Sequence, residues 1–152
     1  MSGAGTRVLS GLLVVFAGLF GAAGVAGAAV AAHVAANDRL VAIAASMALI
    51  HAPALLGLAA ILPRAPRLLG LAGVATVVGV VLFSGDLAMR TASGAALFEN
   101  AAPTGGTMLI AGWLLVAVAG LFAMFRKGAR GESAKASAQA PARAPSIDGV
   151  TR

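Results

Sequence analysis

Four long apolar runs dominate the sequence, and they restrict the possible folds more than any other feature. The runs cover approximately residues 8–32, 40–62, 68–89 and 107–125, and Asp86 is the one Asp, Glu, Lys or Arg residue within them. A helix rises about 1.5 Å per residue, so about 20 residues cross the roughly 30 Å hydrocarbon core of a bilayer. We therefore predict an all-α, polytopic membrane protein built as a bundle of four transmembrane helices.

The composition excludes a soluble fold of this size. Hydrophobic residues make up 60% and charged residues 11% of the chain, against roughly 45–50% and about 25% in soluble domains. The chain contains no cysteine, which excludes disulfides, thiolate metal sites and cysteine nucleophiles. The apolar runs must therefore face lipid or one another.

Prolines and charged residues mark the ends of the runs. Residues 63–67, with the sequence Pro-Arg-Ala-Pro-Arg, end the second run because two prolines so close together cannot continue a helix. Residues 91–106 carry polar side chains, Pro103 and several glycines, and we predict an interfacial loop there with room for a short helix. Arg126 and Lys127 stop the fourth run.

The last part of the chain differs in composition from the rest. Residues 128–152 are mostly Ala, Ser, Pro, Lys, Arg and Gly, with almost no large apolar side chains. Such a segment cannot compensate the entropy lost on ordering. We therefore predict a transmembrane domain over residues 1–127 and a disordered, basic cytoplasmic tail over residues 128–152.

The basic residues near the ends of the runs predict the orientation. With a cytoplasmic N-terminus the outer side has only Arg39 and Arg90, and the inner side has seven basic residues, Arg7, Arg64, Arg67, Arg126, Lys127, Arg130 and Lys135. Cytoplasmic loops carry the excess of Lys and Arg, so both termini are predicted to be cytoplasmic. The basic residues of the tail predict contact with anionic lipid headgroups and no binding to nucleic acid.

A cleaved signal peptide is the main alternative for the first run. Arg7 precedes this run, and Ala26-Gly27-Ala28 resembles a cleavage site. However, the run has 25 residues, from Val8 to Ala32, and the apolar region of a signal peptide has roughly 7–15. A transmembrane helix is therefore the better interpretation.

Glycines predict how the helices pack, because small residues let helix backbones approach closely in lipid. The predicted packing glycines are Gly18, Gly21, Gly24 and Gly27 in the first run, Gly70, Gly73 and Gly79 in the third, and Gly112 and Gly120 in the fourth. A phosphate site is a poorer interpretation, because a phosphate loop needs a helix start that faces water. Trp113, next to Gly112, is predicted at the outer membrane interface.

His51 lies near the middle of the second run, where an ionisable group is costly unless it is paired. We therefore predict that it faces the bundle. Pro53 follows two residues later and frees a backbone carbonyl, so His51 has two interpretations. It either satisfies local groups at a kink or takes part in a proton relay or ligand site.

Asp86 lies four residues before Arg90, and this spacing places the two side chains on one helix face. One interpretation is an ion pair with Arg90 at headgroup level. The other is a pair with His33 at the end of the first run, which could bind a proton or, with a third ligand, a metal ion. Together with His51 and Ser84, these residues form a candidate polar site for a proton or a ligand.

Motifs that carry catalytic chemistry are absent from the sequence. It contains no G-x-S-x-G, H-E-x-x-H or nucleotide-binding P-loop motif and no paired carboxylates within the apolar runs. We therefore expect neither an enzyme nor a bound cofactor or metal.

The order of several short motifs resembles a known family, the small four-helix bacterial inner-membrane proteins grouped as domain of unknown function 423. That family has a His after small residues at the end of helix one, a midspan His in helix two, F-S-G in helix three, and P-x-G-G and G-W in helix four. The corresponding segments here are Ala31-Ala32-His33, His51–Gly57, Leu82–Gly85, Pro103–Gly106 and Gly112-Trp113. The resemblance covers about residues 8 to 125 and implies the bacterial inner membrane.

The sequence also departs from that family. Alanines replace the glycines usual before His33, Met47-Ala48 replaces a usual Tyr-Gln pair, and Asp86 stands where a Ser is common. The family has no established activity, so the resemblance implies a fold and a topology without a mechanism.

Two functions follow as hypotheses. The first is a non-enzymatic structural or interaction protein of the cell envelope, with the lipid bilayer, a membrane-protein partner or a second copy of the chain as its partners. The alternative is a small transporter or proton-coupled permease that uses His33, His51 and Asp86.

Overall fold

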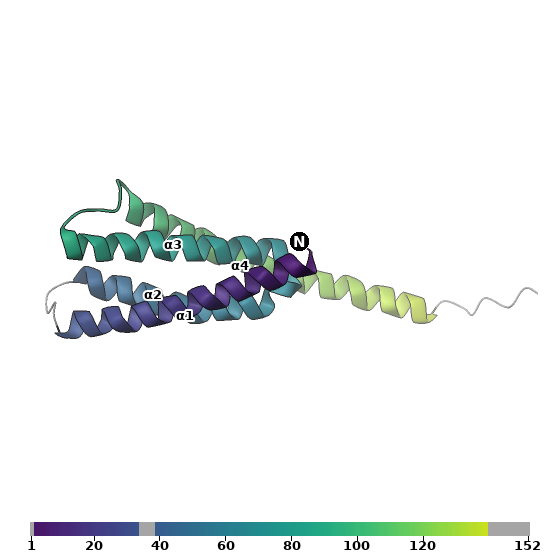
Figure 1. The fold of residues 1–152 in the computed structure, drawn as a ribbon. Helices are drawn as coiled ribbons and strands as arrows, with labels where there is room; N and C mark the ends of the chain where they lie inside the picture. Colours follow the sequence, from purple (N-terminus) through teal and green to yellow (C-terminus); the bar gives the residue numbers. More distant parts are fainter. Residues whose placement is uncertain (1, 34–38, 140–152) are drawn as a thin grey trace, which may run out of the picture.

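The computed structural model describes residues 2–33 and 39–139, and for residues 126–139 it describes the backbone. Its elements, in chain order, are α1 (Gly3–His33), α2 (Arg39–Ile61), a short 3-10 helix η1 (Leu62–Arg64), α3 (Pro66–Ser93) and α4 (Ala101–Gln139). The described ranges contain no strand, so the all-α prediction is confirmed (Figure 1).

Each of the four long helices is long enough and apolar enough to cross a membrane. Large apolar side chains are exposed on all of them, for example Leu19, Ile50, Leu71 and Ile110. A surface of this kind would drive aggregation in water. The helices therefore agree with the predicted number of spans and indicate a multi-pass membrane protein.

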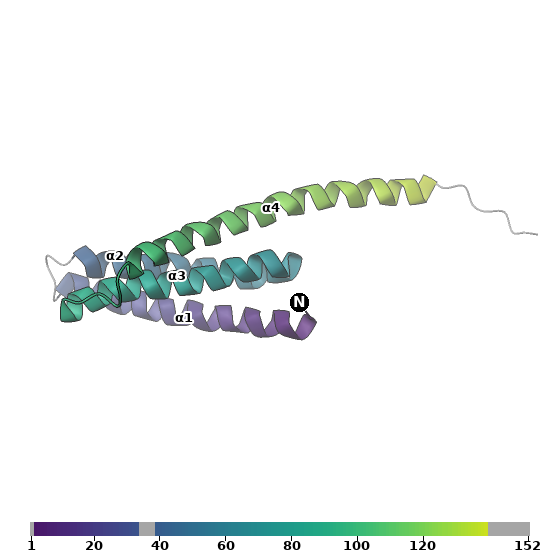
Figure 2. The same cartoon turned by 90° about the horizontal axis from the view of Figure 1, so that it is seen from above.

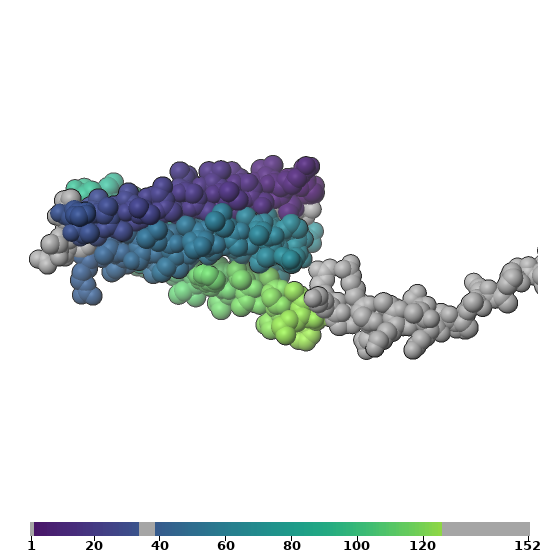
Figure 3. All heavy atoms as spheres, turned by 90° about the horizontal axis from the view of Figure 1, so that it is seen from below, coloured from purple at the N-terminus to yellow at the C-terminus, as the bar shows by residue number. Residues whose placement is uncertain are grey.

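The helices form two antiparallel hairpins, α1 with α2 and α3 with α4, and the hairpins meet where α2 packs on α3 (Figure 1). Helix α4 packs mainly on α3 and diverges from the other helices toward its C-terminal end (Figure 2). It is also the least covered helix, since 39% of the most apolar stretch of α3 is buried but only 17% of that of α4. One side of α4 is thus open (Figure 3).

The core is made of a few large side chains and many small ones. Leu13, Leu55, Leu62 and Val80 are fully buried, and α2 contributes a row of buried alanines. Small residues bring helix backbones close together, and close packing is a main source of helix association in lipid.

The connection between α3 and α4 is shorter than the sequence predicts. Helix α3 ends at Ser93 and is capped by Gly94, which has a φ of 74° and donates its N–H to the Arg90 carbonyl. Helix α4 begins at Ala101, directly after Asn100 with its φ of 66°. The predicted interfacial loop is therefore helical from residue 101, because a proline such as Pro103 is tolerated in the first turn of a helix.

The structure differs from the predicted disordered tail over residues 128–139. Helix α4 continues through them to Gln139, and their Ala, Arg, Glu, Lys and Gln residues have good intrinsic helix propensity. Residues 140–152 of the predicted tail lie outside the described residues.

Candidate functional site

His51 connects α2 to α4. Its side chain is buried, with 4% of its surface exposed. The Nδ1 atom lies 2.7 Å from the Met47 carbonyl oxygen, and the Trp113 Nε1–H donates to Nε2 across 3.3 Å. A carbonyl only accepts and an indole N–H only donates, so these contacts require a neutral imidazole with its proton on Nδ1.

The depth of the two residues explains their pairing. Helices α2 and α4 begin at the same end of the bundle (Figure 1), and each residue lies 12 positions after the first residue of its helix. This spacing corresponds to roughly 18 Å of rise, near the middle of a membrane span. The prediction of an interfacial Trp113 is therefore wrong, because α4 begins earlier than the apolar run does.

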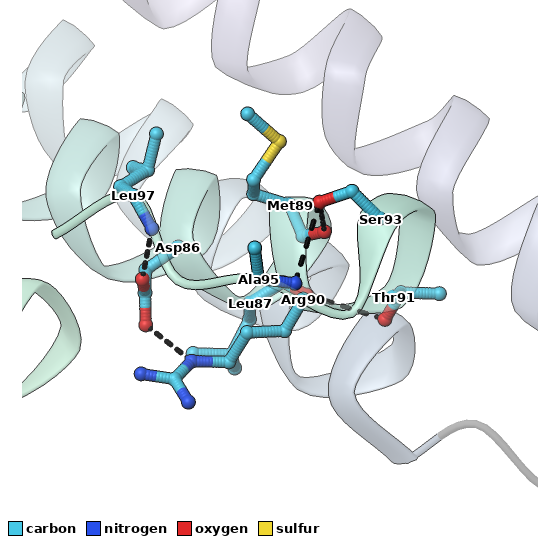
Figure 4. Close-up of polar contacts among 8 residues, drawn as sticks. All are labelled: Asp86, Leu87, Met89, Arg90, Thr91, Ser93, Ala95 and Leu97. Atoms are coloured by element: carbon cyan, nitrogen blue, oxygen red, sulfur yellow. Dashed lines mark hydrogen bonds and ion pairs between the residues drawn. The ribbon is translucent and has the colours of Figure 1, made fainter.

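Asp86 is fully buried near the end of α3. Its Oδ2 accepts a hydrogen bond from Arg90 Nε across 2.7 Å, and its Oδ1 accepts one from the Leu97 backbone N–H across 2.8 Å (Figure 4). One oxygen is thus neutralised by the next turn of the same helix. The other holds the connection between α3 and α4 against the end of α3.

The hydroxyl groups of Ser10 and Ser84 add two further contacts between helices. Ser84 in α3 donates to the Ala44 carbonyl of α2 across 3.0 Å, and Ser10 in α1 donates to the Ala59 carbonyl of α2 across 3.0 Å. Both are hydrogen bonds from a side chain to the backbone of a neighbouring helix, which are favoured in lipid because water is absent there.

The candidate polar residues are not brought together into one site. His33 is exposed at the end of α1, whereas His51, Ser84 and Asp86 each bond to other partners. No hydrogen bond or ion pair joins any two of these four residues. Nowhere in residues 2–33 and 39–125 do three His, Asp or Glu side chains gather as a metal site would require.

The predicted packing glycines have different surroundings. A Cβ on Gly24 or Gly27 would lie within 3.0 Å of Leu49 or Ala45 of α2, respectively. A Cβ on Gly21 would make ordinary contact with Ala52, at 3.8 Å, and one on Gly18 would meet no atom within 4 Å.

Gly112 faces α3, where a Cβ would lie 3.0 Å from Thr76 Oγ1 and 3.3 Å from the Ala72 carbonyl oxygen. A contact as tight as that of Gly24, and against backbone atoms, is at a glycine that the packing prediction did not include. A Cβ on Gly105 would lie 2.6 Å from the Phe83 backbone nitrogen and 2.8 Å from the Gly79 carbonyl oxygen. Gly105 belongs to the P-x-G-G segment, and that motif was the signal from which its packing role could have been found.

Four of the five motifs behind the family resemblance lie at contacts between helices. The P-x-G-G segment packs on Phe83 of the F-S-G segment, Ser84 of F-S-G bonds to α2, and the G-W segment reaches the midspan His51. Each contact joins two helices, so the motif residues act in the assembly of the bundle.

The family comparison agrees with this geometry. A family model described as "Protein of unknown function (DUF423)" matches residues 20–106, which extend from the middle of α1 into the first turns of α4. Comparison with curated proteins and with solved structures gives no match. Because the family model covers more than half of the 152 residues, the chain belongs to the DUF423 family.

Proposed function

We propose that this chain is a non-enzymatic, multi-pass protein of the bacterial inner membrane, with both termini in the cytoplasm, and that it has a structural or interaction role in the cell envelope. The observation that carries this proposal is that its buried polar side chains already have partners within the protein, and that His51 bonds to a neighbouring helix. Among the described residues, no buried side-chain nitrogen or oxygen lacks a hydrogen-bond partner. A site for catalysis or transport would need polar groups free to meet a substrate.

The geometry does not favour the alternative of a proton-coupled transporter. For His51 to carry a proton, its Nε2 would have to take up a hydrogen, and this N–H would then face the Trp113 N–H. Asp86 has both oxygens occupied by Arg90 and Leu97. His33 is separated from both, at the exposed end of α1.

The open side of α4 supports an interaction role. Several large side chains on this helix are more than half exposed, among them Ile110, Leu114 and Phe122. Lipid, a membrane-protein partner or a second copy of the chain would cover them, and we expect the basic residues after position 125 to meet anionic headgroups. Deleting residues 128–152 should therefore change localisation or complex formation.

The proposed orientation can be tested with single cysteines, because the chain has none of its own. Ser2→Cys and Glu99→Cys place a thiol at exposed positions at the two ends of the bundle. A membrane-impermeant maleimide added to intact cells whose outer membrane has been permeabilised should label the position 99 variant and spare the position 2 variant. The reverse pattern would disprove the orientation.

The absence of transport can be tested in reconstituted vesicles. We expect pH-gradient dissipation by the purified chain to equal that of empty vesicles. The variants His33→Ala, His51→Ala and Asp86→Ala should alter thermal stability without altering this flux. A flux that is present in the parent chain and lost in His51→Ala would overturn the non-transport proposal and support the permease.

A further inference from the structure

A groove runs along the open side of α4. Two cavities of about 250 and 300 Å³ lie between α4 and the other helices. Ile61 of α2 and Val116 of α4 line both cavities, so the two lie end to end along α4. The groove begins beside Gly57 and Trp113 and ends beside Arg64 and Ala123.

The groove exists because α4 diverges from the bundle and because its walls carry small residues. Gly57 lines one cavity and Gly120 the other, and a Cβ on either would meet no atom within 4 Å. Figure 3 shows the face on which α4 lies alongside the rest of the bundle. Most lining residues are apolar, including Leu58, Leu69 and Phe122.

The length of the groove matches one leaflet of a bilayer. On α4 it extends from Gly112 to Ala123, and these 11 steps correspond to about 16 Å of rise. Half of the hydrocarbon core of a bilayer is about 15 Å. A transmembrane helix from a second copy would need a groove that continues across the other leaflet, but there α4 is packed closely on α3 through Gly105 and Phe83.

The groove ends at a positive charge. Arg64 lines its end, and no acidic residue is among the lining residues. The structure gives the Arg64 side chain no ion pair or hydrogen bond with any residue of the described ranges. Arg67 is exposed in the first turn of α3, three residues further on, so the local charge is complementary to a phosphate.

We propose that this groove binds one anionic phospholipid, with an acyl chain along the groove and the phosphate at the Arg64 guanidinium. Basic pockets between transmembrane helices are known binding sites for anionic headgroups. The inference rests on the membrane location in the proposed function, and it holds for either orientation of the chain. It differs from the contact expected for the tail, because its charge lies in the bundle itself.

Trp113 allows a direct test, because it lines the groove and is the only tryptophan in the chain. The full-length protein is reconstituted into phosphatidylcholine vesicles that contain an increasing fraction of phosphatidylglycerol brominated on its acyl chain. Bromine quenches a nearby indole. We expect brominated phosphatidylglycerol to quench at a mole fraction about fivefold lower than brominated phosphatidylcholine, the factor for one basic residue near an anionic phosphate.

Two variants test the two parts of the site. Arg64→Gln should bring the ratio between the mole fractions at which the two brominated lipids quench Trp113 close to one. Gly57→Leu should fill the groove and so remove the preferential quenching of Trp113 by brominated phosphatidylglycerol. This variant should fold, because the leucine side chain enters open space. The matched controls, Arg7→Gln for charge at the same end and Gly18→Leu for an added side chain elsewhere, should keep the preference of the parent chain.

Native mass spectrometry of the same proteins identifies what occupies the groove. We expect one phosphatidylglycerol retained by the parent chain and both controls, and none retained by Arg64→Gln or Gly57→Leu. An equal loss of preference in Arg64→Gln and Arg7→Gln would show general surface charge and overturn the proposal. If the parent chain is instead a dimer without retained lipid, and Gly57→Leu dissociates this dimer, the groove binds a second copy of the chain. That result would also overturn the proposal. Neither result would affect the cysteine labelling that tests the proposed function.

Discussion

The hydrogen bond between Trp113 and His51 gives a buried histidine a structural role. The Nδ1–H of His51 is used within α2 and its Nε2 is used by α4, so the ring has no nitrogen left for a ligand. Its location within a span therefore does not by itself indicate chemistry, although ionisable residues in membranes often do. His51 and Trp113 connect two helices that the chain order separates by α3.

Trp113→Phe should destabilise the protein by about 0.6 kcal/mol, the mean for hydrogen bonds between transmembrane helices, and by no more than about 1.7 kcal/mol. The phenyl ring keeps most of the contact area, and the change leaves His51 Nε2 without its donor. Unfolding in mixed detergent, followed by circular dichroism, measures this change in free energy.

The same substitution in a His51→Ala background isolates the hydrogen bond. In that background Trp113→Phe should lower the free energy of unfolding much less, because the acceptor His51 Nε2 is already absent. An equal loss in the free energy of unfolding in the two backgrounds would show that the indole stabilises the protein through its contact area alone.

Asp86→Ala should loosen the connection between α3 and α4. The substitution removes the acceptor of the Leu97 N–H and the partner of Arg90, so the amides of residues 94–100 should exchange with deuterium faster. Hydrogen-exchange mass spectrometry measures this directly. Glu99→Gln removes a negative charge from an exposed position in the same connection, and exchange there should stay as in the parent chain.

At the scale of elements, the contact between α3 and α4 depends on the absence of side chains. Gly105 faces backbone atoms of Phe83 and Gly79, which cannot move aside as a flexible side chain can. Gly18 on α1 faces open space. A glycine in a membrane helix is therefore not evidence of packing until its neighbours are known, even when it belongs to a regular row such as that of α1.

Gly105→Ala should destabilise the protein by about 1–3 kcal/mol, as expected when a methyl group is forced into a closely packed contact. Gly18→Ala should be neutral or should stabilise α1 by up to about 1 kcal/mol, because alanine is the better helix former. Thermal unfolding of both variants in the same detergent compares them. A similar destabilisation by both would mean that Gly18 also has a partner in the folded protein.

The four helices could be predicted from the sequence, because a run of about 20 apolar residues is set by the thickness of the membrane. The start of α4 could not, since Pro103 and the glycines after it are equally typical of a loop and of a first helical turn. That difference concealed the depth of Trp113 and hence its bond to His51. The ion pair of Asp86 with Arg90 was one of two interpretations, because spacing of four residues is local but burial and the Leu97 contact depend on tertiary structure.

At the scale of the whole molecule, α4 is both a transmembrane helix and an extension beyond the bundle. Its 39 residues are more than any other helix of the described chain contains, and its last turns project past the end of the other three (Figure 2). The bundle and the extension should therefore respond separately to truncation.

Removing residues 128–152 should lower the helical content by about the 12 residues of α4 from 128 to 139, without changing the thermal midpoint of the bundle. Removing only residues 140–152 should leave the helical signal as it is. Circular dichroism of the three purified proteins in one detergent makes the comparison. Equal helical signals after both truncations would show that residues 128–139 are not helical in solution.

The continuation of α4 sets a limit on electrostatic reach. Gln139 is 14 positions beyond Phe125, which corresponds to about 21 Å along the helix axis. Ionic screening at physiological salt reduces the field of charged headgroups over about 8 Å. When the helix lies along the membrane normal, the field of the headgroups is therefore strong only at the first turns after Phe125. The residues near Gln139 lie beyond this field, where they are available to a binding partner in the aqueous phase.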